Sequence, residues 1–233
     1  MRRNLTRAIV GGMALGAATF ALPGVATAAP TASFSCAETA TPTSPNGWGN
    51  SFGDERGQAG KITATNVQDQ DGSLEFVTSP TTPRQASYHP AGKTPLADVV
   101  NKPFTFEKSE GNANWQIRVT GANTGSGDGF ATLVWSAPDK AGKTADAASS
   151  DQWWATRDLP GITKGQNATL AQLVTAANSE GKTTVVDDYG ISSQPNSGNG
   201  KVNVDNVSFN GCTTNFAATG AGGAFGSLES LIP

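Results

Sequence analysis

The chain has 233 residues, of which 28 are Gly and 13 are Pro, and 15% are charged. That length fits one large domain or two small ones, at roughly 150 residues a domain. Five Trp and ten Phe can seed one hydrophobic core, and the composition disfavours a disordered chain, a coiled coil and a helical bundle. Because 16 basic residues stand against 19 acidic ones, we expect no binding to nucleic acid.

The first residues have the pattern of an export signal. Three arginines within the first seven residues precede a mostly apolar run over 8–25, and Ala26-Thr27-Ala28 fits a signal-peptidase site. Gly and Pro interrupt the apolar run, which disfavours the alternative of a transmembrane helix. The sequence therefore predicts a signal peptide over 1–28, no transmembrane segment, and a secreted protein that is extracellular or associated with the cell surface.

Two cysteines, Cys36 and Cys212, lie near opposite ends of the mature chain. In an exported protein an even pair favours a disulfide bond. Such a bond requires Cα atoms within about 7 Å, so the first and last strands should be neighbours. The alternative of free thiols or a metal site is disfavoured, because the chain has one His and no Cys-x-x-Cys.

After a lead-in over 29–46, short β-like runs alternate with turn clusters as far as residue 217. Gly, Asn and Asp in the separators supply the positive φ angles that turns need. Alternation in the last run predicts that Val202, Val204 and Asn206 share one face of a strand, with Val207 on the other. The runs cover 61–67, 73–78, 85–89, 104–107, 115–120, 130–136, 152–156, 183–187 and 201–209.

One segment has helical periodicity instead. Apolar residues recur at helical spacing over 170–177, Thr169 with Gln172 has the pattern of a capping box, and Gly181 stands where a helix would end. The sequence therefore predicts one short helix near 169–180.

About nine strands with adjacent ends predict an all-β fold, an antiparallel jelly-roll β-sandwich over 47–217, followed by a low-complexity tail over 218–233. Several short motifs occur in a recognisable order. They are Trp48 with Gly53-Asp54-Glu55-Arg56, Asp71-Gly72-Ser73-Leu74-Glu75, Ala131-Thr132-Leu133-Val134-Trp135, Trp153-Trp154, Val204-Asp205-Asn206-Val207 and Thr213-Thr214-Asn215-Phe216. This series resembles the largely uncharacterised concanavalin-like jelly-roll domains of bacterial secreted and surface proteins. The resemblance implies that fold and an extracellular location, and it supplies no catalytic residues.

Catalytic signatures are few. The only His is His89, and no convincing nucleophile elbow occurs, which disfavours a Ser–His hydrolase. One His and two Cys cannot complete a zinc site. Glycoside hydrolysis needs two carboxylates about 5–10 Å apart. The candidates are Glu75, Glu107, Glu110, Asp187 and Asp188. No motif places two of them on one concave face, and alternation turns Glu75 toward solvent, so we favour a non-catalytic protein.

Oxygen donors suited to calcium occur in two segments, Asp69-Gln70-Asp71-Gly72 and Asp187-Asp188. The first lacks the remaining ligand positions of an EF-hand loop. A structural calcium ion assembled from separate loops is the one cofactor that the sequence leaves open.

Aromatic residues carry the binding hypothesis, because Trp faces stack on sugar rings while polar side chains bind the hydroxyls. Trp48 lies between glycines in a loop-like context and is expected to be exposed. Trp153 and Trp154 are neighbours on a strand, so one should face the core and the other solvent. Asn206 is a candidate partner for sugar hydroxyls.

These observations predict a secreted, non-catalytic β-sandwich that binds a glycan or cell-envelope surface, such as a cell-wall polysaccharide. One alternative is a structural or adhesive envelope protein that docks through its C-terminal tail. The other is a glycan-cleaving hydrolase. The fold alone does not decide among the three.

Overall fold

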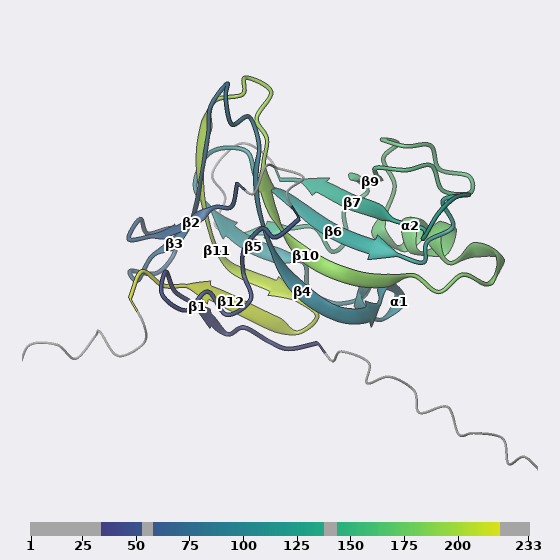
Figure 1. Cartoon of the computed structure of the whole chain (residues 1–233), viewed down its shortest axis with the longest axis horizontal. Coiled ribbons are helices and arrows are strands. Elements are labelled where there is room, and N and C mark those ends of the chain that lie inside the picture. The colour runs from purple at the N-terminus through teal and green to yellow at the C-terminus, as the bar shows by residue number, and fades with distance from the viewer. Residues whose placement is uncertain (1–33, 53–57, 138–143, 220–233) are drawn as a thin grey trace, which may run out of the picture. The chain divides into compact units, whose positions relative to one another are not determined.

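A computed structural model describes residues 34–52, 58–137 and 144–219. The predicted signal peptide over 1–28 and most of the tail predicted over 218–233 lie outside these residues. The described part is built mainly of strands, which form two sheets with a shared core, together with short helices (Figure 1). The predicted all-β sandwich is confirmed.

The larger sheet has seven strands, and its longest member, β11, pairs with β3, β5 and β12. These pairings are antiparallel; β12 follows β11 after two residues, whereas β3 and β5 come from much earlier in the chain. The members of this sheet are β1 (Thr39–Ala40), β2 (Lys61–Thr63), β3 (Ser73–Thr78), β5 (Thr105–Lys108), β8 (Ala145–Asp146), β11 (Gly200–Phe209) and β12 (Cys212–Phe216).

The smaller sheet is antiparallel and has the strand order β4-β10-β6-β7-β9. Its members are β4 (Gln85–Pro95), β6 (Asn114–Thr120), β7 (Ala131–Ser136), β9 (Trp153–Ala155) and β10 (Val185–Ser193). Strand β10 runs well past the predicted end at residue 187, because it is paired along its length with β4 on one side and β6 on the other. Those pairings join distant segments, so local composition did not reveal them.

Aromatic rings fill the space between the sheets. Phe104 meets Trp115, Trp153 and Phe209 edge-on at centroid distances of 5.6 Å each, and Phe209 stacks on Tyr189 at 4.0 Å. These five residues come from both sheets and the loops between them, and all are buried. Edge-to-face contacts between rings add to the stabilisation from burial alone.

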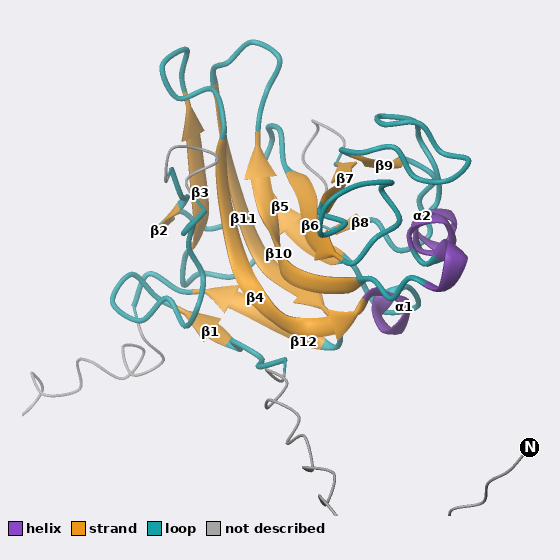
Figure 2. Cartoon of the chain, turned by 45° about the vertical axis from the view of Figure 1, so that its right-hand side comes forward, coloured by secondary structure: helices purple, strands orange, loops and turns teal. Residues whose placement is uncertain are grey.

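The predicted helix is confirmed as α2 (Leu170–Ala177), and a 3₁₀ turn follows over Ser179–Gly181. The Thr169 Oγ1 accepts from the Gln172 backbone N–H and the Gln172 Oε1 accepts from the Thr169 backbone N–H, so the capping box is formed. Helix α2 packs beside β9, and the shorter α1 (Leu96–Val99) follows the end of β4 (Figure 2). Within the described residues, no helix is long and apolar enough to cross a membrane.

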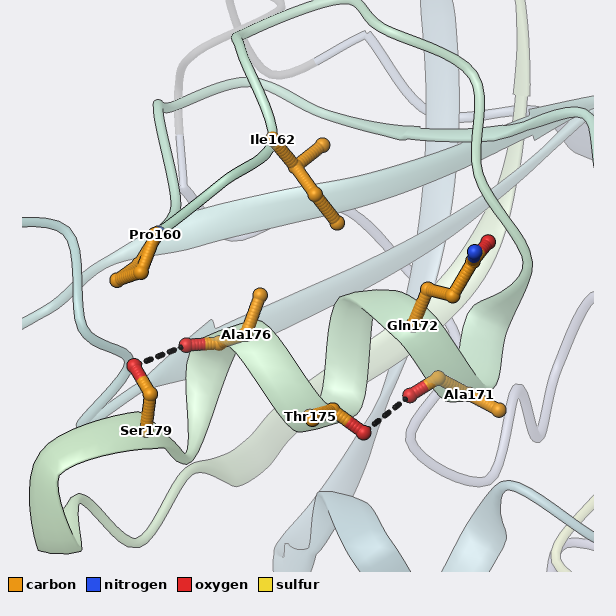
Figure 3. Close-up of a pocket in the computed structure, with 7 residues that line it drawn as sticks. All are labelled: Pro160, Ile162, Ala171, Gln172, Thr175, Ala176 and Ser179. Carbon is orange, nitrogen blue, oxygen red and sulfur yellow. Dashed lines mark hydrogen bonds between the residues drawn. The ribbon is translucent and has the colours of Figure 1, made fainter.

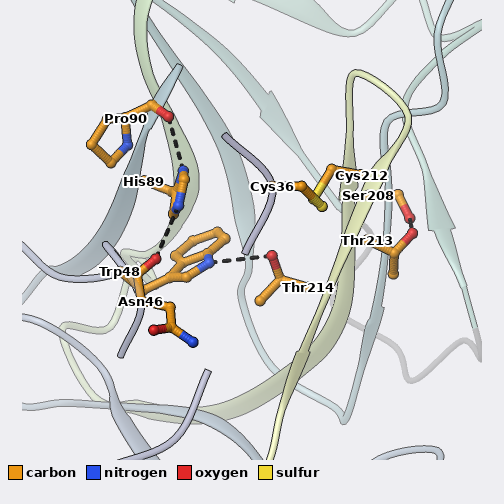
Figure 4. The surroundings of a disulfide bond; sticks show 9 residues. All are labelled: Cys36, Asn46, Trp48, His89, Pro90, Ser208, Cys212, Thr213 and Thr214. Carbon is orange, nitrogen blue, oxygen red and sulfur yellow. Dashed lines mark hydrogen bonds between the residues drawn. A yellow bond between two sulfur atoms is a disulfide. The ribbon is translucent and has the colours of Figure 1, made fainter. Parts of the chain in front are cut away.

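The disulfide bond between Cys36 and Cys212 is formed, with the Cα atoms 5.5 Å apart (Figure 4). Just after Cys36, β1 pairs with β12, and Thr39 lies opposite Asn215. The first and last strands are therefore neighbours, as predicted. The pairing is parallel, and β1 belongs to the sheet although it lies inside the segment that the sequence marked as a lead-in.

Strand β11 departs from the predicted alternation at a bulge. Asn206 has a φ of 48°, and the register of pairing with β5 shifts between Asp205 and Ser208. A bulge inserts one residue and changes which side chains face inward. Val207 consequently joins Val202 and Val204 in the core, so the prediction that placed Val207 on the opposite face is wrong.

Candidate functional site

Polar side chains line the outer face of the five-stranded sheet. On β6, Trp115 and Ile117 point into the core, so Asn114 and Gln116 lie on the other face of the sheet, where neighbouring side chains largely cover them. The Gln116 Nε2 donates to the Ser192 Oγ of β10 at 2.9 Å, and the Asn114 Nδ2 donates to the Ser192 backbone oxygen at 3.3 Å. Neighbouring strands therefore fix the orientation of two amide side chains.

These residues line a depression of about 730 Å³, which we name the amide groove. Its volume lies within the range of about 300–1,000 Å³ that is common for small-molecule sites. The lining residues are Arg84, Asn112, Asn114, Gln116, Val134, Ser136, Ala137, Trp154, Thr156, Gln194 and Asn196. Five of them are amides, and one is a tryptophan.

Hydrogen bonds between the lining residues hold the groove in shape. The Asn112 Oδ1 accepts from the Asn114 Nδ2 at 2.9 Å and from the Gln194 backbone N–H at 2.7 Å. The Arg84 guanidinium lies 3.4 Å from both the Gln116 Oε1 and the Tyr88 hydroxyl. Such contacts reduce the ordering cost that binding would otherwise carry.

Of the two adjacent tryptophans, Trp153 is buried and donates its indole N–H to the Ala147 carbonyl at 2.8 Å. Trp154 is half-buried and lies beside Val134 in the amide groove. One faces the core and the other the surface, as strand alternation predicted. The structure thus retains Trp154 and not Trp153 as a residue that a ligand can reach.

The prediction that Trp48 is exposed is wrong. Only 6% of its surface is accessible, and its indole N–H donates to the Thr214 hydroxyl at 3.3 Å (Figure 4). The ring also packs edge-on against Tyr189 and Phe216, at centroid distances of 5.5 and 5.0 Å. Trp48 lies in a loop-like local sequence, but residues far away in the chain pack against it and bury it.

Asn206 lies on the other sheet, at the bulge of β11. Its side-chain amide donates to the Glu107 Oε2 at 3.2 Å. The structure therefore does not bring Asn206 together with Trp154, and the two candidate binding residues do not share one surface.

The candidate catalytic carboxylates are dispersed. Glu75 pairs with Lys201 at 2.6 Å, and Asp187 pairs with Lys93 at 2.5 Å. Glu75 lies opposite the buried faces of Leu74 and Phe76, as predicted. The described residues that line the amide groove include no Asp or Glu, so a pair of carboxylates is not assembled there.

His89 is buried, with its Nδ1 2.9 Å from the Pro90 carbonyl oxygen and its Nε2 3.1 Å from that of Asn46 (Figure 4). Burial lowers the pKa of the imidazole below its ordinary value of 6.5, although both carbonyls oppose that change. With both nitrogens occupied by backbone, this histidine holds the Asn46 loop against β4.

Next to the amide groove, aromatic rings surround a guanidinium. The Arg118 guanidinium carbon lies 3.9 Å from the ring centre of Phe52 and 4.9 Å from that of Phe130, within the range of cation–π attraction. On the neighbouring strand, opposite Arg118, lies Asp188. Burial raises the pKa of Asp188 to about 6, despite the opposing charge of Arg118.

Asp188→Asn should therefore change how stability depends on pH. A folded-state pKa above the ordinary 3.8 gives a contribution to stability that is present below the unfolded value and is lost as pH rises through about 6. The free energy of unfolding of the wild type minus that of the variant should therefore be larger at pH 4 than at pH 7.5. Urea unfolding of both proteins at the two pH values measures this difference, and an equal difference at both would contradict the assignment.

A second depression, of about 460 Å³, lies beside α2 (Figure 3). The Thr175 hydroxyl donates to the Ala171 carbonyl at 3.0 Å, and the Ser179 hydroxyl donates to that of Ala176 at 2.7 Å. Its lining also includes Pro160, Ile162 and Gln172, with no charged side chain among the described residues. The hydroxyls are committed to the helix, so we assign no chemistry to this depression.

One group of side chains could hold a metal. Asp69, Asp71 and Asp205 each present a carboxylate oxygen within 4.8 Å of the others. The sequence indicated the first two residues, whereas Asp205 comes from β11. The other predicted calcium segment, Asp187-Asp188, is not part of this group.

Comparisons of the chain with models of known families, with curated proteins and with solved structures give no match. The functional argument therefore rests on the residues of this chain.

Proposed function

We propose that this is an exported, non-catalytic β-sandwich protein that binds a neutral glycan of the cell envelope through the amide groove. The observation that carries the proposal is the half-buried Trp154 in a groove lined by amides. Asn114 and Gln116 are buried and held by β10, whereas Gln194 and Asn196 are exposed to a ligand. An indole face covers the C–H surface of a sugar ring, while amides donate to and accept from its hydroxyls. The jelly-roll resemblance and the N-terminal export pattern support the same proposal.

The composition of the groove favours an uncharged ligand. Arg84 is the only charged residue in the described lining, and its guanidinium already contacts Gln116 and Tyr88. A strongly anionic polymer would need more cationic partners than the groove offers. A neutral polysaccharide matches the hydrogen-bonding groups that are present.

Trp154→Ala should weaken binding to cell-wall polysaccharide by about 10-fold or more, equivalent to about 1.4 kcal/mol. Depletion of the protein from solution by insoluble cell walls and by common neutral polysaccharides measures the change. The same supernatants are assayed for released reducing sugar, which a glycan-cleaving enzyme would produce.

The matched control is Val77→Ala, which shortens an apolar side chain that is 50% exposed on the seven-stranded sheet. This variant should bind as the wild type does. Equal loss in both variants, or unchanged binding in Trp154→Ala, contradicts the assignment of the groove. Sugar release would favour the hydrolase alternative instead.

A further inference from the structure

An acidic cluster lies on the seven-stranded sheet, where the segment between β2 and β3 meets β11 and β12. Asp69 and Asp71 come from that segment, Asp205 from the bulge of β11, and Asn215 from β12. The Asn215 Nδ2 donates to the Asp71 Oδ2 at 2.8 Å, and the Ala218 backbone N–H donates to the Asp71 carbonyl at 2.7 Å. The cluster therefore joins three separate parts of the chain.

Asp205 is the unusual member, because it is a fully buried carboxylate with 0% exposure. Its Oδ1 accepts from the backbone N–H groups of Asn206 and Phe216, at 2.8 and 2.9 Å. Its Oδ2 has no hydrogen-bond partner among the described residues. Leaving a buried carboxylate oxygen without a partner is unfavourable, so a bound ligand at this oxygen would stabilise the fold.

Two further buried oxygens in the same place lack a partner in the described part of the chain, namely the Asp71 Oδ1 and the Asn215 Oδ1. All three unsatisfied atoms are acceptors, and a bound molecule that donates to them or carries positive charge would satisfy them together.

We infer that Asp69, Asp71, Asp205 and Asn215 form a calcium-binding site. Calcium binds oxygen ligands at about 2.3–2.6 Å, so two oxygens on one ion lie at most about 5 Å apart. The carboxylate oxygens lie within 4.8 Å of one another, which needs no rearrangement of the strands. Magnesium keeps several waters and uses one or two carboxylates, whereas this cluster offers three with an amide oxygen.

The site would fasten the segment before β3 to β11 and β12 of the same sheet. Gly72 follows Asp71 with a φ of 141°, and a Cβ there would lie 2.6 Å from the Thr63 carbonyl oxygen and from the Ala218 nitrogen. The backbone is thus already packed closely at the cluster. The ion would act as a structural brace on this sheet, independently of the amide groove.

The test measures thermal unfolding of the purified protein after removal of metal with a chelator, then with added CaCl₂ or MgCl₂. Calcium at about 100 times its dissociation constant should raise the melting temperature by about 5–10 °C. Magnesium at the same concentration should give a smaller rise. Calorimetric titration should show one calcium ion per chain.

Asp205→Asn keeps the shape of the side chain and an oxygen for the two backbone donors, and it removes the buried charge. In chelator this variant should melt no lower than the wild type, and its calcium affinity should fall about 100-fold or more. Asp69→Asn changes a residue outside the strands and supplies a second test of affinity. Asp187→Asn, at the ion pair with Lys93, is the matched control and should keep the full response.

Three results would overturn the inference. They are a wild-type melting temperature that calcium leaves unchanged, a calcium response that persists in both Asp205→Asn and Asp69→Asn, and a magnesium response equal to that of calcium. None of these measurements involves a glycan, so failure of this inference is distinguishable from failure of the proposed function.

Discussion

Replacing Cys36 with Ser and Cys212 with Ala should lower the free energy of unfolding by about 2–5 kcal/mol. The bond joins residues 176 positions apart, and a loop of that length restricts the unfolded chain strongly. Most of the loss should therefore come from a less restricted unfolded state, with the sandwich of the variant unchanged. Urea unfolding of the oxidised wild type and the variant measures the loss.

Reduced wild-type protein is the matched control, because it lacks the bond and retains both cysteines. It should unfold at nearly the same urea concentration as the variant. An unchanged midpoint in both would show that the denatured chain is already compact around these residues, contrary to the loop-closure argument.

Trp48→Ala should destabilise the fold by about 3–5 kcal/mol, as large-to-small changes of buried aromatic residues do. The ring is 6% exposed and packs against Tyr189 and Phe216. Removing it opens a cavity and leaves the buried Thr214 without the indole donor. Thermal and urea unfolding measure the loss.

Trp48→Phe is the control for this prediction, because it keeps an aromatic ring and removes the indole N–H. Its loss of stability should be clearly smaller than that of the alanine variant. Below their melting temperatures both variants should bind polysaccharide as the wild type does. Reduced binding by fully folded Trp48→Phe would contradict the purely structural role of this ring.

Elements with local signals were predicted well from the sequence. The run over 73–78 coincides with β3, and the Thr169–Gln172 capping box gave the start of α2. The runs over 115–120 and 130–136 correspond to β6 and β7. In each case the residues that determine the element lie close together in the sequence, so the spacing of the apolar residues and the helix cap can be recognised directly.

Features that depend on distant segments were missed. Trp48 has the surroundings of a loop, yet its partner Thr214 lies 166 residues further along the chain. The bulge at Asn206 overrode the alternation that assigned Val207 to the wrong face. Strand β12 was also missed, although here a local signal exists: Asn210-Gly211, both with positive φ, form the two-residue turn that joins β12 to β11.

For each of the two candidate sites, the sequence indicated some of the residues and missed others. Trp154 was one of the two adjacent tryptophans of which the sequence expected one to be exposed. Asn114 was not identified, although it is the first residue of β6, in which apolar residues alternate. Asp69 and Asp71 were recognised as calcium donors. Asp205 gave no such signal, because β11 contains several polar residues and alternation places Asp205 on the face opposite Val202 and Val204.

The disulfide also determines how the described domain responds to mechanical tension. Cys36 and Cys212 lie close to its first and last described residues, 34 and 219. A force applied at those residues would therefore pass through the covalent bond and bypass the intervening chain. An oxidised molecule held from both ends would extend by only a few residues and keep its groove, whereas a reduced one would unravel from β1 and β12.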